Sequence, residues 1–193
     1  MKSAAYDRIM DIVSEHDELA FTVGLALLPL VFVDFALIPL SVLGIEGGLD
    51  TLGYLGMEDV NVDRNGDSFT ITYNDSDGEP ITQTCDYDAA TDSIRTVISQ
   101  PGGGGDALIF EYVGADGAYA SQYLFDSDDE FSLIRVFFDG DIMAIGIDTV
   151  ESMPDSIFKK TGLQADFVKN DATYFILEGG TLTVFADGEV VEY

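Results

Sequence analysis

The chain has 193 residues, enough for one domain with a sizeable core and too few for two independent enzymatic domains. It carries 36 acidic residues against 8 basic ones, a formal net charge of −28 at pH 7, while 47% of its residues are hydrophobic. The apolar content excludes a disordered acidic tail, and the scattered cations exclude direct binding of nucleic acid, which needs a basic patch.

The large negative charge predicts adaptation to molar salt. Like charges repel over a Debye length of about 10 Å at 0.1 M salt, but over only about 3 Å at 1 M. Lysine, in contrast to the abundant aspartate, occurs only at Lys2, Lys159, Lys160 and Lys169. We therefore expect the chain to come from an extreme halophile, such as a haloarchaeon, or from a virus of one.

The distribution of charge divides the chain into residues 1–57 and residues 58–193. The first region has eight acids and two bases, whereas the second has 28 acids and six bases. We expect an α+β protein, in which a hydrophobic helical N-terminal region precedes an acidic, mainly antiparallel β-meander. The meander could be a curled sheet, a sandwich or an open barrel.

An amphipathic helix is expected first, over Ser3–Glu18. Tyr6, Ile9, Met10 and Val13 recur there at helical spacing. His16, the single histidine, follows them between carboxylates. We interpret it as part of a solvated helix end rather than as a metal ligand, and one histidine with one cysteine excludes a zinc site built from these residue types.

The run from Leu19 to Ile45 is almost entirely apolar and longer than the roughly 20 residues that span a bilayer. Pro29 and Pro39 interrupt it, and Asp34 is its one charged residue. Three interpretations remain open: membrane insertion or contact, a buried pair of short helices, and a cleaved signal. Asp34 would be an ion site or helix contact in a membrane, or the cap of the second buried helix.

Alternating strands dominate residues 58–193. Hairpin dipeptides separate several of them, at 65–66, 77–78, 116–117, 139–140, 179–180 and 187–188. A short helix is expected over Pro154–Thr161, since proline often starts a helix and Gly162 would end it. The expected strands are Ser68–Asn74, Ile81–Tyr87, Ser93–Ser99, Ala107–Val113, Ala118–Phe125, Phe131–Phe138, Ile142–Ile147, Ala172–Leu177, Thr181–Phe185 and Glu189–Glu192.

Candidate sites in this region are weak. Cys85 shares the parity of Ile81 and Tyr87, which predicts a buried hydrophobic role rather than a nucleophile. Gly102–Gly105 lacks the lysine and helix of a phosphate loop, so we interpret it as a β–β connection. Three acid-dense loops could bind Ca²⁺ or Mg²⁺, although acidic turns are expected throughout a halophilic protein. Their candidate ligands are Asp63, Asn65, Asp67, Asp75, Asp77, Glu79, Asp126, Asp128 and Asp129.

The sequence thus favours a non-enzymatic structural or interaction protein without a cofactor. Residues 19–45 would attach it to a lipid bilayer or a protein partner, within a homo- or hetero-oligomer such as a virion or a cell envelope. If the run spans a membrane, Lys2 and Arg8 favour a cytoplasmic N-terminus, with the acidic domain outside in a high-salt medium. The alternatives are a soluble β-rich module that binds lipid or another apolar ligand, in the cytoplasm of a halophile, and, in third place, an enzyme.

Overall fold

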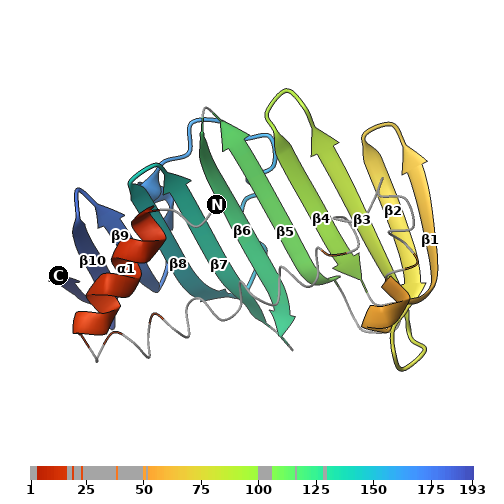
Figure 1. Ribbon diagram of the computed structural model, residues 1–193, viewed down its shortest axis with the longest axis horizontal. Helices are drawn as coiled ribbons and strands as arrows, with labels where there is room; N and C mark the ends of the chain where they lie inside the picture. Colours follow the sequence, from red (N-terminus) through yellow and green to blue (C-terminus); the bar gives the residue numbers. More distant parts are fainter. Residues whose placement is uncertain are drawn as a thin grey trace.

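The structure, a computed structural model, is an open antiparallel sheet with a short helix on one side and a long connection on the other (Figure 1). It describes residues 4–16, 19, 23, 38, 50, 52–99, 106–115, 117–127 and 130–193. The eleven strands follow one another in sequence order, each hydrogen-bonded to the next.

The helical elements are α1 (Ala4–Glu15) and two short 3-10 helices, η1 (Gly53–Leu55) and η2 (Ala165–Val168). The strands are β1 (Glu58–Asn65), β2 (Ser68–Asn74), β3 (Pro80–Asp88), β4 (Ser93–Ser99), β5 (Asp106–Ala115), β6 (Ala118–Ser127), β7 (Glu130–Asp139), β8 (Ile142–Val150), β9 (Thr173–Glu178), β10 (Thr181–Ala186) and β11 (Glu189–Glu192).

The antiparallel meander predicted from alternation is confirmed, and its eleven strands form one open sheet. The ten predicted strands correspond to β2–β11. The sequence analysis missed β1, because its eight residues include only Val60 and Val62 as apolar members. Pairing with β2, from Val62 opposite Ile71 to Asn65 opposite Ser68, makes this segment a strand.

Tight turns explain the regular succession of strands. At the β10–β11 turn, Asp187 and Gly188 have φ angles of 54° and 81°. Two consecutive left-handed residues are the requirement of a type I′ hairpin, whose twist matches that of the flanking strands. The dipeptides at 77–78 and 179–180 likewise lie between paired strands, whereas Asn65 and Asp139 are the last residues of β1 and β7, so that the turns there are 66–67 and 140–141.

Successive side chains point to opposite faces of the sheet, and each face of its C-terminal half packs a different segment. We call the face that contacts α1 the helix face. There Ile9, Ile12 and Val13 of α1, with Leu19 and Val23, pack in one buried cluster with the sheet residues Phe138, Met143, Ile145, Phe175, Leu177, Leu182 and Val184. The predicted amphipathic helix therefore exists, but Ile12 rather than Met10 faces the core, since Met10 is 41% exposed.

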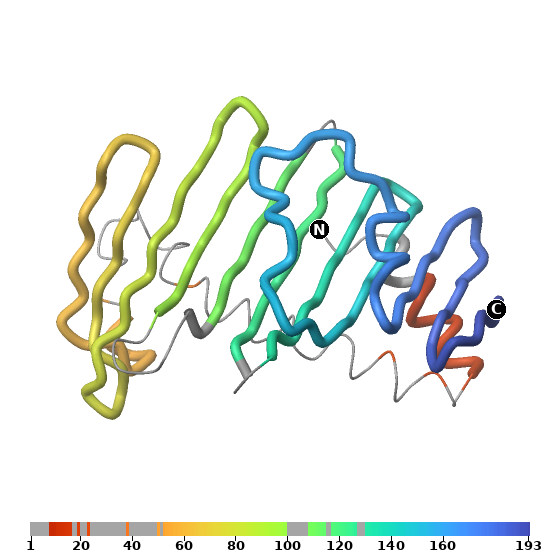
Figure 2. The backbone as a smooth tube through the Cα atoms, turned by 180° about the vertical axis from the view of Figure 1, so that it is seen from behind, coloured from red at the N-terminus to blue at the C-terminus, as the bar shows by residue number. Residues whose placement is uncertain are grey.

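The opposite face is covered by residues 151–172, the connection from β8 to β9, which we call the strap (Figure 2). The strap residues Ile157 and Val168 are buried in a second cluster with Val113, Ala120, Phe137, Ala144 and Ile176 of the sheet. These sheet residues alternate with those of the first cluster, so the strap and α1 lie on opposite faces. We call this side the strap face.

The predicted helix at Pro154–Thr161 is wrong, because this stretch of the strap has no helical structure. Amides that a helix would use internally are bonded to the sheet instead: the N–H of Ile157 donates to Glu111, and that of Lys159 donates to the Ser93 hydroxyl. Lys159 also has a left-handed φ of 65°, which a right-handed helix cannot accommodate. Tertiary bonds thus override the start and stop signals.

The predicted hydrophobic helical N-terminal region is not supported beyond α1. Within the run 19–45 the structure describes Leu19, Val23 and Ile38, and Asp34 lies outside the described residues. Among the residues described, no helix is long and apolar enough to cross a membrane.

Candidate functional site

A row of polar side chains crosses the strap face at one level of the sheet. The register places Arg95 opposite Glu111, Glu111 opposite Gln122, and Gln122 opposite Arg135. These four residues of β4–β7, which we call the polar row, lie on strands whose other strap-face residues are mainly apolar. Directly opposed side chains on one face are close enough to interact, so the row forms a continuous polar line.

Glu111 is the centre of the row and is 1% exposed. Its carboxylate accepts hydrogen bonds from the Ser156 hydroxyl at 2.6 Å, from the Ile157 N–H at 2.8 Å and from Gln122 Nε2 at 2.8 Å. Arg95 Nε lies 3.4 Å from the same carboxylate. A buried carboxylate is tolerated when its charge is paired and its oxygens are bonded, and these partners supply both conditions.

Gln122 extends this contact, because Nε2 also donates to the backbone carbonyl of Asp155 at 3.2 Å. Two neighbouring strands therefore hold three consecutive strap residues, 155–157, through one side chain each. Charge-assisted bonds of this kind are stronger than neutral ones, so Glu111 is the principal anchor of the strap.

A second anchor joins Arg135 to Asp171 at the far end of the strap, with 2.5 Å between Arg135 Nη1 and Asp171 Oδ1. Asp171 is 3% exposed and lies against Gly146 of β8, where a Cβ atom would come within 1.9 Å of Asp171 Oδ2. Only glycine leaves room for this carboxylate. The Arg135 guanidinium also lies 5.8 Å from the centre of the Phe167 ring, which is a cation–π distance.

Burial determines the electrostatics of this second anchor. Loss of solvation on burial, opposed by Arg135 and aided by the nearby Asp148, raises the pKa of Asp171 from its ordinary 3.8 to about 6. The Oδ2 atom of Asp171 and the Nε of Arg135 have no hydrogen-bond partner among the described residues. The Asp171 carboxylate is therefore incompletely satisfied, whereas both oxygens of the Glu111 carboxylate accept hydrogen bonds.

A third anchor lies near the β3–β4 turn, where Lys159 Nζ is 3.2 Å from Asp88. The hydrogen bond from the Thr91 hydroxyl, and then that from Lys159, lower the pKa of Asp88. The backbone N–H of Lys159 donates to Ser93 Oγ at 3.3 Å. The three anchors together hold the strap across strands β3–β8.

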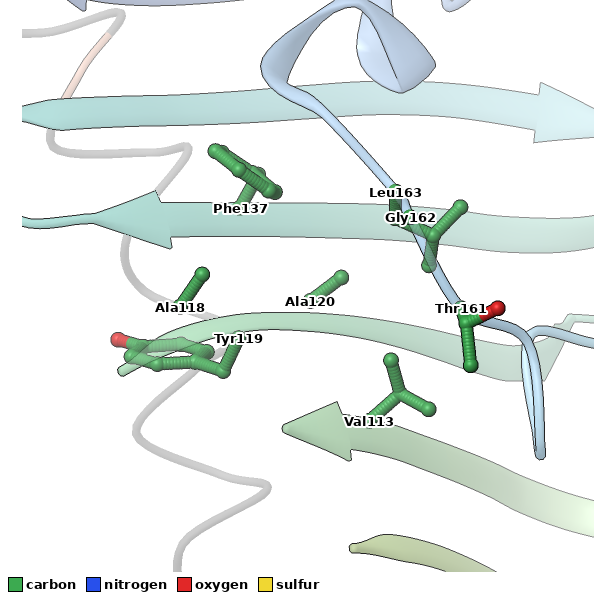
Figure 3. A pocket seen from close by; sticks show the side chains of 8 residues that line it. All are labelled: Val113, Ala118, Tyr119, Ala120, Phe137, Thr161, Gly162 and Leu163. Atoms are coloured by element: carbon green, nitrogen blue, oxygen red, sulfur yellow. The ribbon is translucent and has the colours of Figure 1, made fainter. Parts of the chain in front are cut away.

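A shallow pocket of about 220 Å³ opens between the strap and β5–β7 (Figure 3). The small side chains of Ala118 and Ala120 form its hollow floor, and the strap residues 161–163 form one wall; its further lining residues are Val113, Tyr119 and Phe137. The Thr161 hydroxyl is the one polar side-chain group of the lining besides that of Tyr119. The pocket offers space to a small apolar group and contains no charged side chain.

The described candidate cation ligands are dispersed over several strands and turns of the sheet. Asp63 and Asn65 lie on β1 and Asp67 in the turn that follows, while Asp126 is exposed on β6. In the next loop Asp75 Oδ1 accepts the backbone N–H groups of Asp77 and Glu79, so this carboxylate closes its own turn. Asp128 and Asp129 lie outside the described residues. Within the described ranges of the chain, no three His, Cys, Asp or Glu residues are arranged to hold a metal ion.

The other singled-out residues have ordinary surroundings. His16 stacks edge-on against Tyr193 at 4.8 Å. Cys85 is a buried free cysteine on the helix face, as its parity predicts, and burial raises the pKa of its thiol. Gly102–Gly105, between β4 and β5, lies outside the described residues.

The sequence analysis missed the polar row and Asp171, although one signal was available. Glu111, Gln122 and Arg135 each stand inside a predicted strand, in the segments Leu-Ile-Phe-Glu-Tyr-Val, Ala-Ser-Gln-Tyr-Leu and Leu-Ile-Arg-Val-Phe. A polar residue at the centre of an apolar strand indicates a buried polar contact. Comparison of the chain with models of protein families, with curated proteins and with solved structures finds no match to any of them.

Proposed function

We propose that the protein is a non-enzymatic structural or interaction protein of a high-salt medium, associated with a membrane or forming an assembly. The observation that carries the proposal is the use of the buried polar groups on the strap face. Glu111, Gln122 and Arg135 hold the strap in place, and Glu111 is saturated with partners. This is the arrangement of a scaffold rather than of an exposed reactive centre.

The net charge of the chain supports the high-salt medium in this proposal. A protein with a net charge of −28 avoids self-repulsion only where salt is concentrated. The apolar run 19–45 supplies the length and hydrophobicity for attachment to a bilayer or to a protein partner. A cell envelope or a virion in brine would use both features.

Vesicle flotation of the full-length protein in about 3 M KCl, where charge repulsion is screened, tests the attachment. We expect the protein to float with zwitterionic phosphatidylcholine vesicles or, without lipid, to sediment as an oligomer. The variant Val31→Arg, which adds a charge to the apolar run, should lose attachment, since a buried arginine is costly in either environment. Tyr54→Arg is the matched control, because Tyr54 is 92% exposed.

Two results would contradict this function. A wild-type protein that neither floats nor sediments above the monomer has no attachment to explain. Equal attachment of the Val31→Arg and wild-type proteins would show that the apolar run is not the attachment site.

The helix face favours a second candidate, a soluble module that binds a lipid or another apolar ligand. Aromatic rings form a chain across three strands of this face, with Tyr112 stacked on Tyr119 at 6.0 Å and Tyr119 packed on Phe138 at 5.3 Å. Phe110 and Tyr123 form a further pair at 4.9 Å. Native mass spectrometry of protein purified without detergent should then detect a bound lipid, and a ligand-free mass would count against this candidate.

A further inference from the structure

The outer edge of β11 has backbone groups that point away from the sheet. Tyr193 and Leu182 exchange both backbone hydrogen bonds, N to O at 2.9 and 3.1 Å. Because such pairs alternate along an antiparallel ladder, Val191 and Glu189 also bond toward β10. The N–H and C=O groups of Val190 and Glu192 therefore point outward, where no described residue pairs with them.

The two edges of the sheet differ in their protection against pairing. The edge strand β1 has a register irregularity between Glu58 and Asn61, within which Asp59 adopts a left-handed φ of 53°. Bulges and inserted charges are the devices that keep sheet edges from pairing. The pairing of β11 with β10 is regular throughout.

Exposed apolar side chains lie on both faces of β11. Val190 is 58% exposed on the strap face, and Val191 is 44% exposed on the helix face. Together with the outward backbone groups, they offer what an added strand requires: hydrogen bonds along the edge and apolar contacts on either side. The edge therefore fits a strand as its partner.

The glutamates of β11 determine which strand can pair with its outer edge. In an antiparallel pair of two β11 strands centred on Val191, Val190 lies opposite Glu192 of the second copy and Glu189 lies opposite Tyr193 of the second copy. No glutamate then faces another glutamate, which would be destabilising. The outward groups of Val190 and Glu192 form the hydrogen-bonded pairs of this register, so the strand is complementary to itself.

We propose that β11 is the contact between two copies of this chain, paired antiparallel about a two-fold axis at Val191. The inference deepens the proposed assembly role, on which it rests, by naming its partner and surface. A short edge strand buries little area, so the contact is weak and reversible. It strengthens with salt, because each copy carries the same large negative charge.

Cysteine cross-linking tests the register. Val191 and its copy form a non-hydrogen-bonded pair with Cα atoms about 4.5 Å apart, within the range of a disulfide. Val190 and its copy are diagonal neighbours, about 7–8 Å apart and beyond that range. Under mild oxidation in molar KCl, Val191→Cys should form a disulfide-linked dimer about tenfold faster than Val190→Cys.

The Val190→Cys variant controls for random collisions between molecules. Because Val190 is more exposed than Val191, collisions alone would cross-link Val190→Cys faster than Val191→Cys. The wild-type protein, whose Cys85 is buried, shows the background. Circular dichroism spectra that match the wild type establish that both variants are folded. Cross-linking of Val191→Cys at or below the rate of Val190→Cys overturns the β11 contact. If the wild type nevertheless sediments as an oligomer, the assembly role survives through another surface.

Discussion

At the residue scale, Gly146 is where β8 meets the Asp171 carboxylate of the strap. A methyl group there would overlap Asp171 Oδ2 and lie 2.9 Å from Val168 Cβ, and both neighbours are buried. The strap can approach the sheet closely at this end because residue 146 has no side chain. The position also shows why a glycine inside a strand is informative.

We expect Gly146→Ala to lower the free energy of unfolding by about 2–3 kcal/mol, because it overpacks the site and displaces Asp171 from Arg135. Denaturant unfolding in molar KCl measures the change. Gly53→Ala is the control, since a Cβ at Gly53 would meet no atom within 4 Å. Equal stability of the Gly146→Ala and wild-type proteins would disprove the close approach.

The raised pKa of Asp171 predicts a pH dependence of stability. The folded protein holds a proton on this carboxyl below about pH 6, whereas the unfolded chain does so only below about 3.8. The stabilisation that Asp171 adds to the folded state is therefore fully present below pH 3.8, and it is lost as the pH rises through about 6. Desolvation of the charged form at higher pH is the physical cause.

We expect the stability difference between wild type and Asp171→Asn to grow in favour of the wild type as the pH falls from about 7 toward 4. Unfolding midpoints at several pH values in constant salt measure this difference. The exposed Asp141→Asn, also on the β7–β8 side of the sheet, should show no such trend. If the stability difference between wild type and Asp171→Asn did not change with pH, the raised pKa of the buried Asp171 carboxyl would be contradicted.

At the element scale, the strap is an irregular segment that depends on side chains of the sheet. Its described residues include one short 3-10 helix, and its first half is held by Glu111 and Gln122. Two buried residues, Ile157 and Val168, add apolar contact. The polar anchors select the conformation of this segment, because its own backbone makes few internal hydrogen bonds.

We expect Glu111→Ala to leave the N–H of Ile157, the Ser156 hydroxyl and Gln122 without their shared acceptor, and to destabilise the protein by about 2–4 kcal/mol. Hydrogen exchange at the Ile157 amide should accelerate, as the strap separates from the sheet. Glu151→Ala, at an exposed position of the strap, should leave this exchange rate unchanged. If the Ile157 amide stays protected in Glu111→Ala, apolar packing alone holds the strap.

At the scale of the whole molecule, the sheet has a packed layer on each face of its C-terminal half. The helix α1 and the strap cover opposite sides of the strands from β7 to β9, so a separate cluster of buried residues forms on each side. The N-terminal residues 4–15 thus contact strands more than a hundred residues away. Folding of this half requires long-range contacts that form slowly.

We expect the unfolding midpoint of the full chain to rise when KCl is increased from about 0.1 M to 3 M, since the shorter Debye length screens the repulsion among its acidic residues. Sodium sulfate at equal ionic strength distinguishes screening from salting-out, because it strengthens apolar burial more. A protein that is equally stable in dilute buffer would not be adapted to salt.

The sequence by itself determined the meander. Alternating side chains and turn dipeptides are local signals, and neighbouring strands joined by two-residue turns can only pair with each other. Ten of the strands, the burial of Cys85 and the existence of α1 follow from such signals. Only the tertiary structure decided that β1 is a strand, because β1 depends on its pairing with β2. It also decided the conformation of the strap, where hydrogen bonds to Glu111 and Ser93 replace the helix that the local sequence signals predict. Glu111 and Asp171 are 60 residues apart in the chain, so their common role depends on strand register and on Gly146, which no local pattern encodes.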